Sequence, residues 1–288
     1  MSIKSLTIHS AGSRDSALTV HGNLQTERLA DHLVNARQVR FTHIFTSNLQ
    51  RAYRTAGAIK KAQDAAHKAG PGPVTVVQLP VLREQDFGFY EGKPFYARGR
   101  DGTRSGKEEH RLQHLEDPDF NDVESKEALD LRVSQFIGEY LVTILATESE
   151  DTPATVAVVS HGMTLSHLWR CLLKCFPKKS VRLSLGDTGD ADRIVSLEHL
   201  GGWSNTAFLE LQISLQKPNA ENVPTAESAE ISAKAEHDNK FWFDYEMTIR
   251  AINSRAHLAG LKRTRGVGSS QFDEGQKKIE TFFKKPKV

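Results

Sequence analysis

The sequence predicts an α/β fold, a three-layer sandwich in which a mostly parallel central sheet carries helices on both faces. Short β-rich segments alternate along the chain with segments whose apolar residues recur at helical spacing, and this order favours parallel strands joined by crossover helices. The 288 residues are 38% hydrophobic and 26% charged, which is enough apolar material for a full core. No apolar run approaches the roughly 18 residues of a membrane span.

The expected strands are short runs of apolar, β-branched and aromatic residues that end at polar or glycine-containing loops. Phe41-Thr-His-Ile-Phe-Thr46 is a clear example, because its residue types alternate. The run before Ser160-His161-Gly162 is continuously apolar, as in a strand buried on both faces. The expected strands are residues 5–8, 41–46, 74–79, 155–159 and 206–213.

The expected helices are the segments in which apolar residues recur every three or four positions. The longest is 125–146, and the segment after His161 has a second clear apolar face. Ser47 or Asn48 can provide the N-cap of the helix that follows the second strand. The expected helices are residues 23–37, the segment that begins at 49, 125–146 and the segment that follows His161.

The composition divides the chain into three parts. Residues 1–217 are expected to form one domain, in which the polar and weakly periodic stretch 93–124 is an insertion or lid. Residues 218–239 are polar and rich in Ala, Glu and Ser, as expected of a linker. Residues 240–288 are expected to form a basic tail, partly docked and partly disordered, because Phe241–Met247 is too aromatic to remain in water.

The charge is distributed unevenly. Residues 255–288 contain nine Lys/Arg and three acidic residues, a net charge of +6. Since the whole chain has a net charge of +2, the remainder has −4. Two cysteines, Cys171 and Cys175, and the absence of a signal-peptide pattern predict a reducing compartment, cytoplasmic and/or nuclear.

Residues with useful chemistry follow four of the expected strands: His9, Arg51, Glu84 and His161. Because the carboxyl ends of parallel strands meet at one edge of a sheet, we expect these side chains to converge there. A histidine can act as a nucleophile, an arginine can hold phosphate oxygens with two parallel hydrogen bonds, and a carboxylic acid can protonate a leaving oxygen. A second histidine and helix N–H groups can stabilise the transferring group. Together these residue types indicate phosphoryl transfer through a covalent histidine.

Several segments follow one another in the order of a known family's motifs. They are Leu18-Thr-Val-His-Gly22-Asn-Leu-Gln25, Ser47-Asn-Leu-Gln-Arg51-Ala-Tyr-Arg-Thr55-Ala, Leu82-Arg-Glu84 with Gly88 and Glu91-Gly92, Glu124-Ser125 followed by Arg132, Val159-Ser-His161-Gly, and Trp203-Ser-Asn205-Thr. The second of these is the most specific, since it matches S-x-L-x-R-A-x-x-T-A. Over about residues 3–215 the chain therefore resembles the histidine phosphatase superfamily, the phosphoglycerate mutase-like proteins.

The resemblance implies a role for each candidate residue. Arg51 binds the phosphate of the substrate, Glu84 is the proton donor, and His161 is the second catalytic histidine, which also contacts the phosphate. His9 stands where the family has arginine-histidine-glycine, but here the segment reads Ile8-His9-Ser-Ala-Gly12 and the arginine is missing. His9 is the expected nucleophile.

Two functions follow from this comparison. The first is a phosphatase that hydrolyses a phosphomonoester, either a small molecule or a phosphopeptide, through a phosphohistidine and without metal or other cofactor. The second is a catalytically impaired protein of the same fold that acts as a binding or scaffold module. Phosphatase is preferred to mutase, because the insertion 93–124 has no sequence that indicates phosphoglycerate.

The C-terminal tail contains a possible docking peptide. Gln276-Lys-Lys-Ile279-Glu-Thr-Phe282-Phe283 resembles the PIP-box, Q-x-x-[ILM]-x-x-[FY]-[FY], by which peptides bind the sliding clamp PCNA. Ile279, Phe282 and Phe283 would lie on one side of a helical turn and could enter a hydrophobic groove. The alternative is that the two phenylalanines pack on the domain. The lysines that follow suit an acidic partner or, more weakly, nucleic acid, and no membrane partner is expected.

Overall fold

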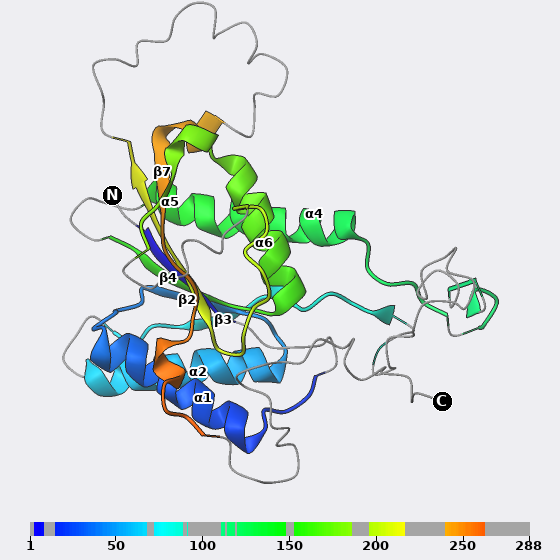
Figure 1. Cartoon of the computed structure of the whole chain (residues 1–288), viewed down its shortest axis with the longest axis horizontal. Coiled ribbons are helices and arrows are strands. Elements are labelled where there is room, and N and C mark those ends of the chain that lie inside the picture. Colours follow the sequence, from blue (N-terminus) through cyan, green and yellow to red (C-terminus); the bar gives the residue numbers. More distant parts are fainter. Residues whose placement is uncertain are drawn as a thin grey trace, which may run out of the picture.

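The computed structural model describes residues 3–8, 15–67, 72–88, 91, 111–112, 114–118, 120–147, 153–185, 196–216 and 240–262. Within these residues one sheet of seven strands has the order β3-β2-β4-β1-β6-β7-β5 (Figure 1). The strands are β1 (Ile3–Ile8), β2 (His43–Thr46), β3 (Val76–Gln78), β4 (Thr155–Val159), β5 (Val181–Leu183), β6 (Phe208–Leu215) and β7 (Tyr245–Ser254).

The sheet is mostly parallel, as predicted. β1, β2, β3 and β4 run in the same direction, β5 is parallel to β7, and β6 is antiparallel to both of its neighbours. Ile8 pairs with Val159, which also pairs with Thr46, and Thr46 pairs with Gln78. These four residues are the ends of β1, β4, β2 and β3, so their strands end at one edge of the sheet. We call this the carboxyl edge.

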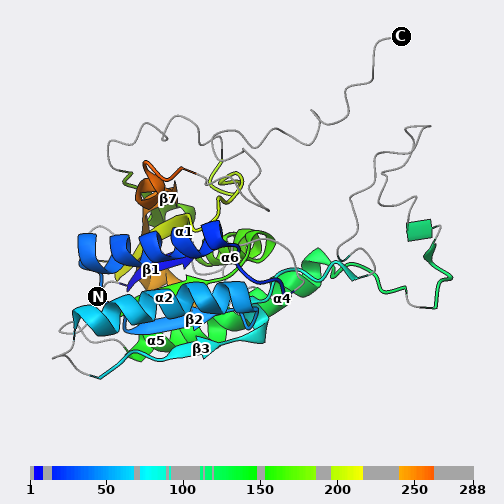
Figure 2. The same ribbon diagram turned by 90° about the horizontal axis from the view of Figure 1, so that it is seen from below.

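Helices cover both faces of the sheet (Figures 1 and 2). One face carries α1 (Val20–Asp31), which continues into a π-helical segment at His32–Ala36, and α2 (Gln50–Ala66). The other face carries α6 (Gly162–Cys175) and a long helix made of α4 (Lys126–Phe136), a π-helical segment (Ile137–Val142) and α5 (Thr143–Thr147). Short 3₁₀ turns lie at Pro80–Leu82, Lys178–Ser180, Lys240–Asp244 and Ala256–Leu258.

Each face has its own hydrophobic core, and β4 belongs to both. Val156 and Val158 pack with residues of α4 and α6, whereas Ala157 and Val159 pack with residues of α1 and α2. Because successive side chains of a strand point to opposite faces, a continuously apolar strand supplies both cores. The three-layer prediction is therefore confirmed.

Details of the helices differ from the expectations. α1 begins at Val20 and not at Asn23, because the Thr19 hydroxyl accepts a 3.0 Å hydrogen bond from the Gly22 N–H and caps the helix. The expected cap of α2 by Ser47 or Asn48 is wrong: the N-cap residue is Leu49. The first-turn N–H of Gln50 instead donates to Asp15 Oδ1 at 2.7 Å, a partner 35 residues away.

The aromatic segment near residue 241 docks on the domain and continues as a strand. Trp242, Tyr245 and Met247 are buried, and β7 pairs with β6 over most of its length. Neither β7 nor β5 was predicted as a strand. Most of the stretch 93–124, the stretch 218–239 and the tail beyond residue 262 lie outside the described residues.

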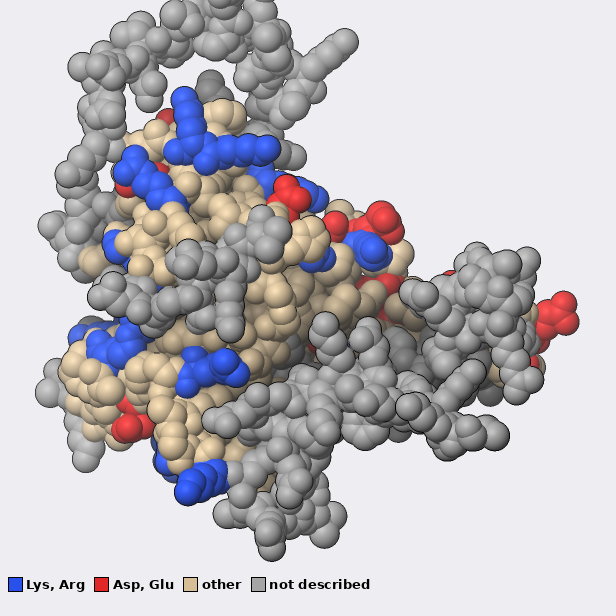
Figure 3. All heavy atoms as spheres, viewed as in Figure 1, with Lys and Arg blue, Asp and Glu red and all other residues tan. Residues whose placement is uncertain are grey.

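None of the described helices is long and apolar enough to cross a bilayer. On the face drawn in Figure 3, the coloured Lys and Arg side chains lie in separate groups, so the described residues there do not form a continuous basic surface.

Candidate active site

Three of the predicted site residues lie together near the carboxyl edge. Arg51 is the second residue of α2, which follows β2, and His161 is the N-cap of α6, which follows β4. Glu84 lies in the loop after β3. All three are buried, with 3%, 0% and 3% of the surface of Arg51, His161 and Glu84 exposed. Three ionisable residues buried at the ends of three strands are unusual for a structural core and typical of a functional site.

The guanidinium of Arg51 contacts His161 directly. Nη2 of Arg51 lies 3.4 Å from Nδ1 of His161. Because a guanidinium carries only donors, Nδ1 is the acceptor in this contact. Burial lowers the pKa of Arg51 from its ordinary value, while the carboxylates of Glu84, Asp15 and Glu91 oppose this change. An arginine stays charged even so, and the site therefore contains a buried cation beside an imidazole.

The Glu84 carboxylate binds the N-terminus of α6. Oε2 accepts a hydrogen bond from the N–H of Met163 at 3.3 Å, and Oε1 accepts one from the N–H of Thr164 at 3.1 Å. Both N–H groups belong to the first helical turn, where no intrahelical acceptor exists, and the helix dipole favours a negative charge there. Glu84 is thus fixed beside His161, the residue that precedes this turn.

Side chains at the start of α6 also hold the backbone of the Glu84 loop. The Ser160 hydroxyl donates to the carbonyl of Leu82 at 2.7 Å, and the Thr164 hydroxyl donates to the carbonyl of Arg83 at 2.6 Å. Thr164 Oγ1 also lies 3.2 Å from Glu84 Oε1. Ser160 therefore connects the turn between β4 and α6 to the loop that contains Glu84. Thr164 was not identified from the sequence, because no motif marks it.

His9 lies outside the described residues, as do Gln276, Ile279, Phe282 and Phe283 of the tail. The described chain reaches Ile8, which pairs with Val159 of β4 on one side and with Phe208 of β6 on the other. The strand before His9 therefore ends beside the strand that leads to His161.

Two cavities flank different parts of the sheet. One of about 360 Å³ lies beside the candidate acid and is lined by Glu84, Asp86, Glu124, Arg83 and Arg132, among others. Charged groups of both signs surround it, which suits a polar ligand group.

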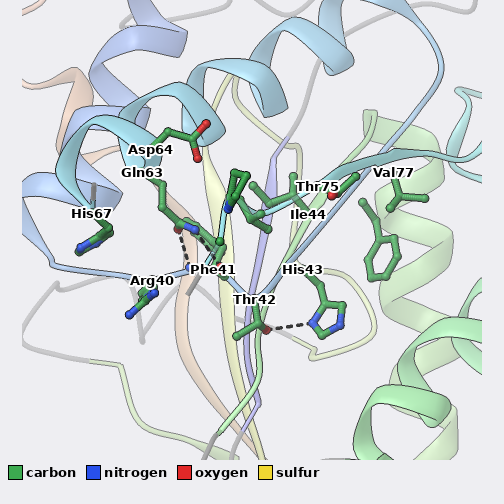
Figure 4. Close-up of a pocket in the computed structure, with 14 residues that line it drawn as sticks. Arg40, Phe41, Thr42, His43, Ile44, Gln63, Asp64, His67, Thr75 and Val77 are labelled. Atoms are coloured by element: carbon green, nitrogen blue, oxygen red, sulfur yellow. Dashed lines mark hydrogen bonds between the residues drawn. The ribbon is translucent and has the colours of Figure 1, made fainter. Parts of the chain in front are cut away.

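A larger cavity of about 770 Å³ lies at the opposite edge of the sheet, between the start of β2 and the end of α2 (Figure 4). Its buried amide, Gln63, is already paired with the N–H and the carbonyl of Phe41, at 2.7 and 2.9 Å. His43 is paired with the hydroxyl of Thr42 at 2.9 Å. This larger cavity is lined by none of the predicted catalytic residues. We therefore place the candidate site at the carboxyl edge, although the cavity there is smaller.

The described residues contain no group of three or more His, Cys, Asp or Glu side chains that could hold a metal ion.

The comparison with known proteins identifies the superfamily to which this fold belongs. The family model of the histidine phosphatase superfamily, branch 1, matches residues 6–201, and the chain belongs to this superfamily. A protein of Schizosaccharomyces pombe, named as a probable phosphatase, is 27% identical over 276 residues, which cover 96% of this chain and 74% of that protein.

Solved structures share the fold at lower identity. A mycobacterial glucosyl-3-phosphoglycerate phosphatase is 19% identical, covers 88% of this chain and 99% of its own, and has a TM-score of 0.52. The complex of that phosphatase with inorganic phosphate is 18% identical over 90% of this chain and 99% of its own, with a TM-score of 0.51. At this identity the likeness establishes the architecture alone.

Proposed function

We propose that the protein is a phosphatase that hydrolyses a phosphomonoester through a phosphohistidine intermediate on His9. The observation that carries the proposal is the convergence of buried Arg51, His161 and Glu84 at the carboxyl edge. Membership of the histidine phosphatase superfamily supports the same reaction class.

Arg51 and His161 are the proposed phosphate-binding residues. A buried guanidinium offers paired N–H donors that match phosphate oxygens, and a phosphate would supply the negative charge that burial makes favourable there. The N-terminus of α6 adds a favourable dipole at the same place. A mycobacterial phosphatase of the same fold has been solved in complex with inorganic phosphate, which supports a phosphorylated substrate here.

The proposed reaction has two steps. A ring nitrogen of His9 attacks phosphorus, the bond from phosphorus to the leaving oxygen breaks, and Glu84 gives its proton to that oxygen to release the alcohol. A water molecule then attacks the phosphohistidine, the P–N bond breaks, and Glu84 takes the proton of the water. The products are the alcohol and inorganic phosphate, and His9 and Glu84 return to their starting states. For the first step Glu84 must turn one oxygen from the N–H groups of α6 toward the substrate.

The competing proposal is a binding or scaffold module that has kept the fold and lost the chemistry. It is supported by the sequence around His9, where the family's arginine is missing. A phosphorylated small molecule or phosphopeptide would then bind through Arg51 and His161 without turnover.

One trapping experiment separates the two proposals. The protein is mixed with p-nitrophenyl phosphate, quenched under alkaline conditions that preserve phosphohistidine, digested and analysed by mass spectrometry. A phosphoryl group on the peptide that contains His9, absent in His9→Gln, supports the phosphatase. No turnover by the wild-type protein, with no change on His161→Ala, refutes it and favours the binding module.

We further propose that the tail recruits the protein to the sliding clamp PCNA, which would require nuclear as well as cytoplasmic localisation. The support is the match of all eight positions from Gln276 to Phe283 to the PIP-box, together with the basic residues that follow. The measurement is calorimetric titration of the clamp with a peptide of residues 270–288. Substitution of Phe282 and Phe283 by Ala should abolish binding, and failure of the unaltered peptide to bind at micromolar concentration contradicts the proposal.

A further inference from the structure

We propose that Arg132 is a positioning residue for Glu84, and that it acts by fixing the backbone on both sides of that residue. Nη1 of Arg132 donates to the carbonyls of Val81 and Arg83 at 2.7 and 2.8 Å, and Nη2 lies 3.3 Å from the carbonyl of Glu84. One guanidinium on α4 thus binds three carbonyls of the candidate acid's loop. The inference deepens the proposed function, and its kinetic test rests on it.

Glu124 fixes the orientation of the Arg132 guanidinium and also binds the part of the loop that follows Glu84. Nε and Nη2 of Arg132 bind the two carboxylate oxygens of Glu124 at 2.7 and 2.8 Å, the paired geometry that only arginine can provide. Burial alone would raise the pKa of Glu124, but the hydrogen bonds and charge of Arg132, with smaller effects of the Asp86 N–H and the Arg83 charge, hold that pKa below its ordinary value. Both side chains are largely shielded from water, with exposed fractions of 19% and 17%.

Glu124 binds the far side of the same loop. Its Oε2 accepts a hydrogen bond from the N–H of Asp86 at 3.2 Å, and its own N–H donates to the carbonyl of Asp86 at 2.8 Å. The side-chain amide of Gln85 donates to the carbonyl of Glu124 at 2.7 Å. Arg132 and Glu124 together therefore fix the loop from Val81 to Asp86 on both sides of Glu84.

Arg132 and Glu124 hold the backbone around Glu84 and do not contact its carboxylate. The carboxylate is bound by other groups, namely the N–H groups of Met163, Thr164 and Gln85 and the hydroxyl of Thr164. A proton-donating residue needs a fixed backbone position and a carboxyl group that can reach the leaving oxygen. Misplacement of the carboxyl group by about 1 Å can lower the rate roughly 100-fold. Arg132 fixes this backbone position through its hydrogen bonds to the carbonyls of Val81, Arg83 and Glu84.

The kinetic test uses the leaving group, because proton donation matters most when the leaving oxygen is strongly basic. The variant Arg132→Lys keeps the charge and loses the paired geometry. We expect kcat/KM to fall about 10–100-fold for an alkyl ester, glycerol phosphate, and only a few-fold for p-nitrophenyl phosphate, which needs little protonation. Glu84→Gln should show the same pattern. Equal losses on both esters would contradict a positioning role.

A second measurement needs no turnover, so it stands even if the proposed function fails. Hydrogen exchange is followed at the amides of Met163 and Thr164, whose acceptor is the Glu84 carboxylate, with the amide of Leu165 as internal reference. Leu165 donates within the helix to the carbonyl of His161 at 2.7 Å. In Arg132→Lys we expect the two first-turn amides to exchange about tenfold faster and Leu165 to be unchanged.

Two further variants secure the interpretation of the exchange experiment. Glu124→Gln weakens the same network from the other partner and should give the same pattern if Arg132→Lys folds poorly. Arg182→Lys is the matched control, because Arg182 is exposed on β5, with a 3.4 Å ion pair to Glu246. Unchanged exchange at Met163 and Thr164 in folded Arg132→Lys and Glu124→Gln would overturn the inference.

Discussion

Gly88 lies in the loop that contains Glu84. It is the residue of this loop at which replacement by alanine should lower the stability of the protein most. Its φ is +53°, in the left-handed region. A Cβ atom there would lie 2.3 Å from the carbonyl oxygen of Asn121 and 2.5 Å from that of Asp122. Both contacts are with backbone, so neither can be relieved by rotating a side chain. Gly88→Ala must therefore separate the loop from the segment that leads to Glu124.

The expected cost combines two effects. The left-handed conformation costs a residue with Cβ about 1–2 kcal/mol, and forcing apart packed groups costs about 1–3 kcal/mol more. We therefore expect the free energy of unfolding to fall by about 2–5 kcal/mol in Gly88→Ala, measured by equilibrium urea denaturation.

Gly57 provides a matched control with the opposite sign. It lies inside α2 and a Cβ there would meet nothing within 4 Å. Gly57→Ala should stabilise the protein by about 0.5–1 kcal/mol, the usual gain when alanine replaces glycine in a helix. If Gly88→Ala also left the stability unchanged or raised it, the close approach of residue 88 to residues 121–122 would be refuted, and with it part of the packing around Glu84.

Three further predictions concern separate parts of the molecule. Arg51→Lys should weaken binding of inorganic phosphate about 10–100-fold by calorimetry, since a charged hydrogen bond contributes about 1.5–3 kcal/mol; unchanged affinity would exclude Arg51 from the phosphate site. Thr19→Ala should lower the free energy of unfolding by about 1 kcal/mol in urea, because the Gly22 N–H loses its cap. Burial, with the nearby charge of His32, lowers the pKa of His257 to about 4. The unfolded chain then binds more protons between about pH 4 and 6.5, so stability should decrease as pH falls through this window. His257→Gln should flatten that dependence, and an identical slope would count against it.

The parts of the fold that depend on local pattern could be predicted from the sequence. β4 has the predicted bounds, Thr155–Val159, because a continuous apolar run between turns is a strong strand signal. The convergence of Arg51, Glu84 and His161 was also predictable, since it requires only that their strands be parallel and end at one edge.

The unpredicted parts depend on distant partners. β7 has an alternating pattern in which Tyr245, Met247 and Ile249 are buried, but it becomes a strand only because β6 offers an edge. The cap of α2 comes from Asp15, 35 residues before Gln50. The π-helical segments at His32–Ala36 and Ile137–Val142 share the apolar spacing of the helices they extend. The spacing of apolar residues along the sequence therefore does not reveal the strand pairing, the distant cap or the π-helical turns.

The candidate site has two parts, one on each face of the sheet, and substitutions in one part should have effects different from substitutions in the other. Arg51 belongs to α2, on the face that also carries α1, whereas the Glu84 loop is bound to α4 and α6 on the other face. His161 joins them, because it begins α6 and contacts Arg51. Changes at Arg132 or Gly88 should therefore impair steps that need Glu84 and leave phosphate affinity nearly unchanged. Changes at Arg51 should weaken phosphate binding for every leaving group, and only changes at His161 should impair both.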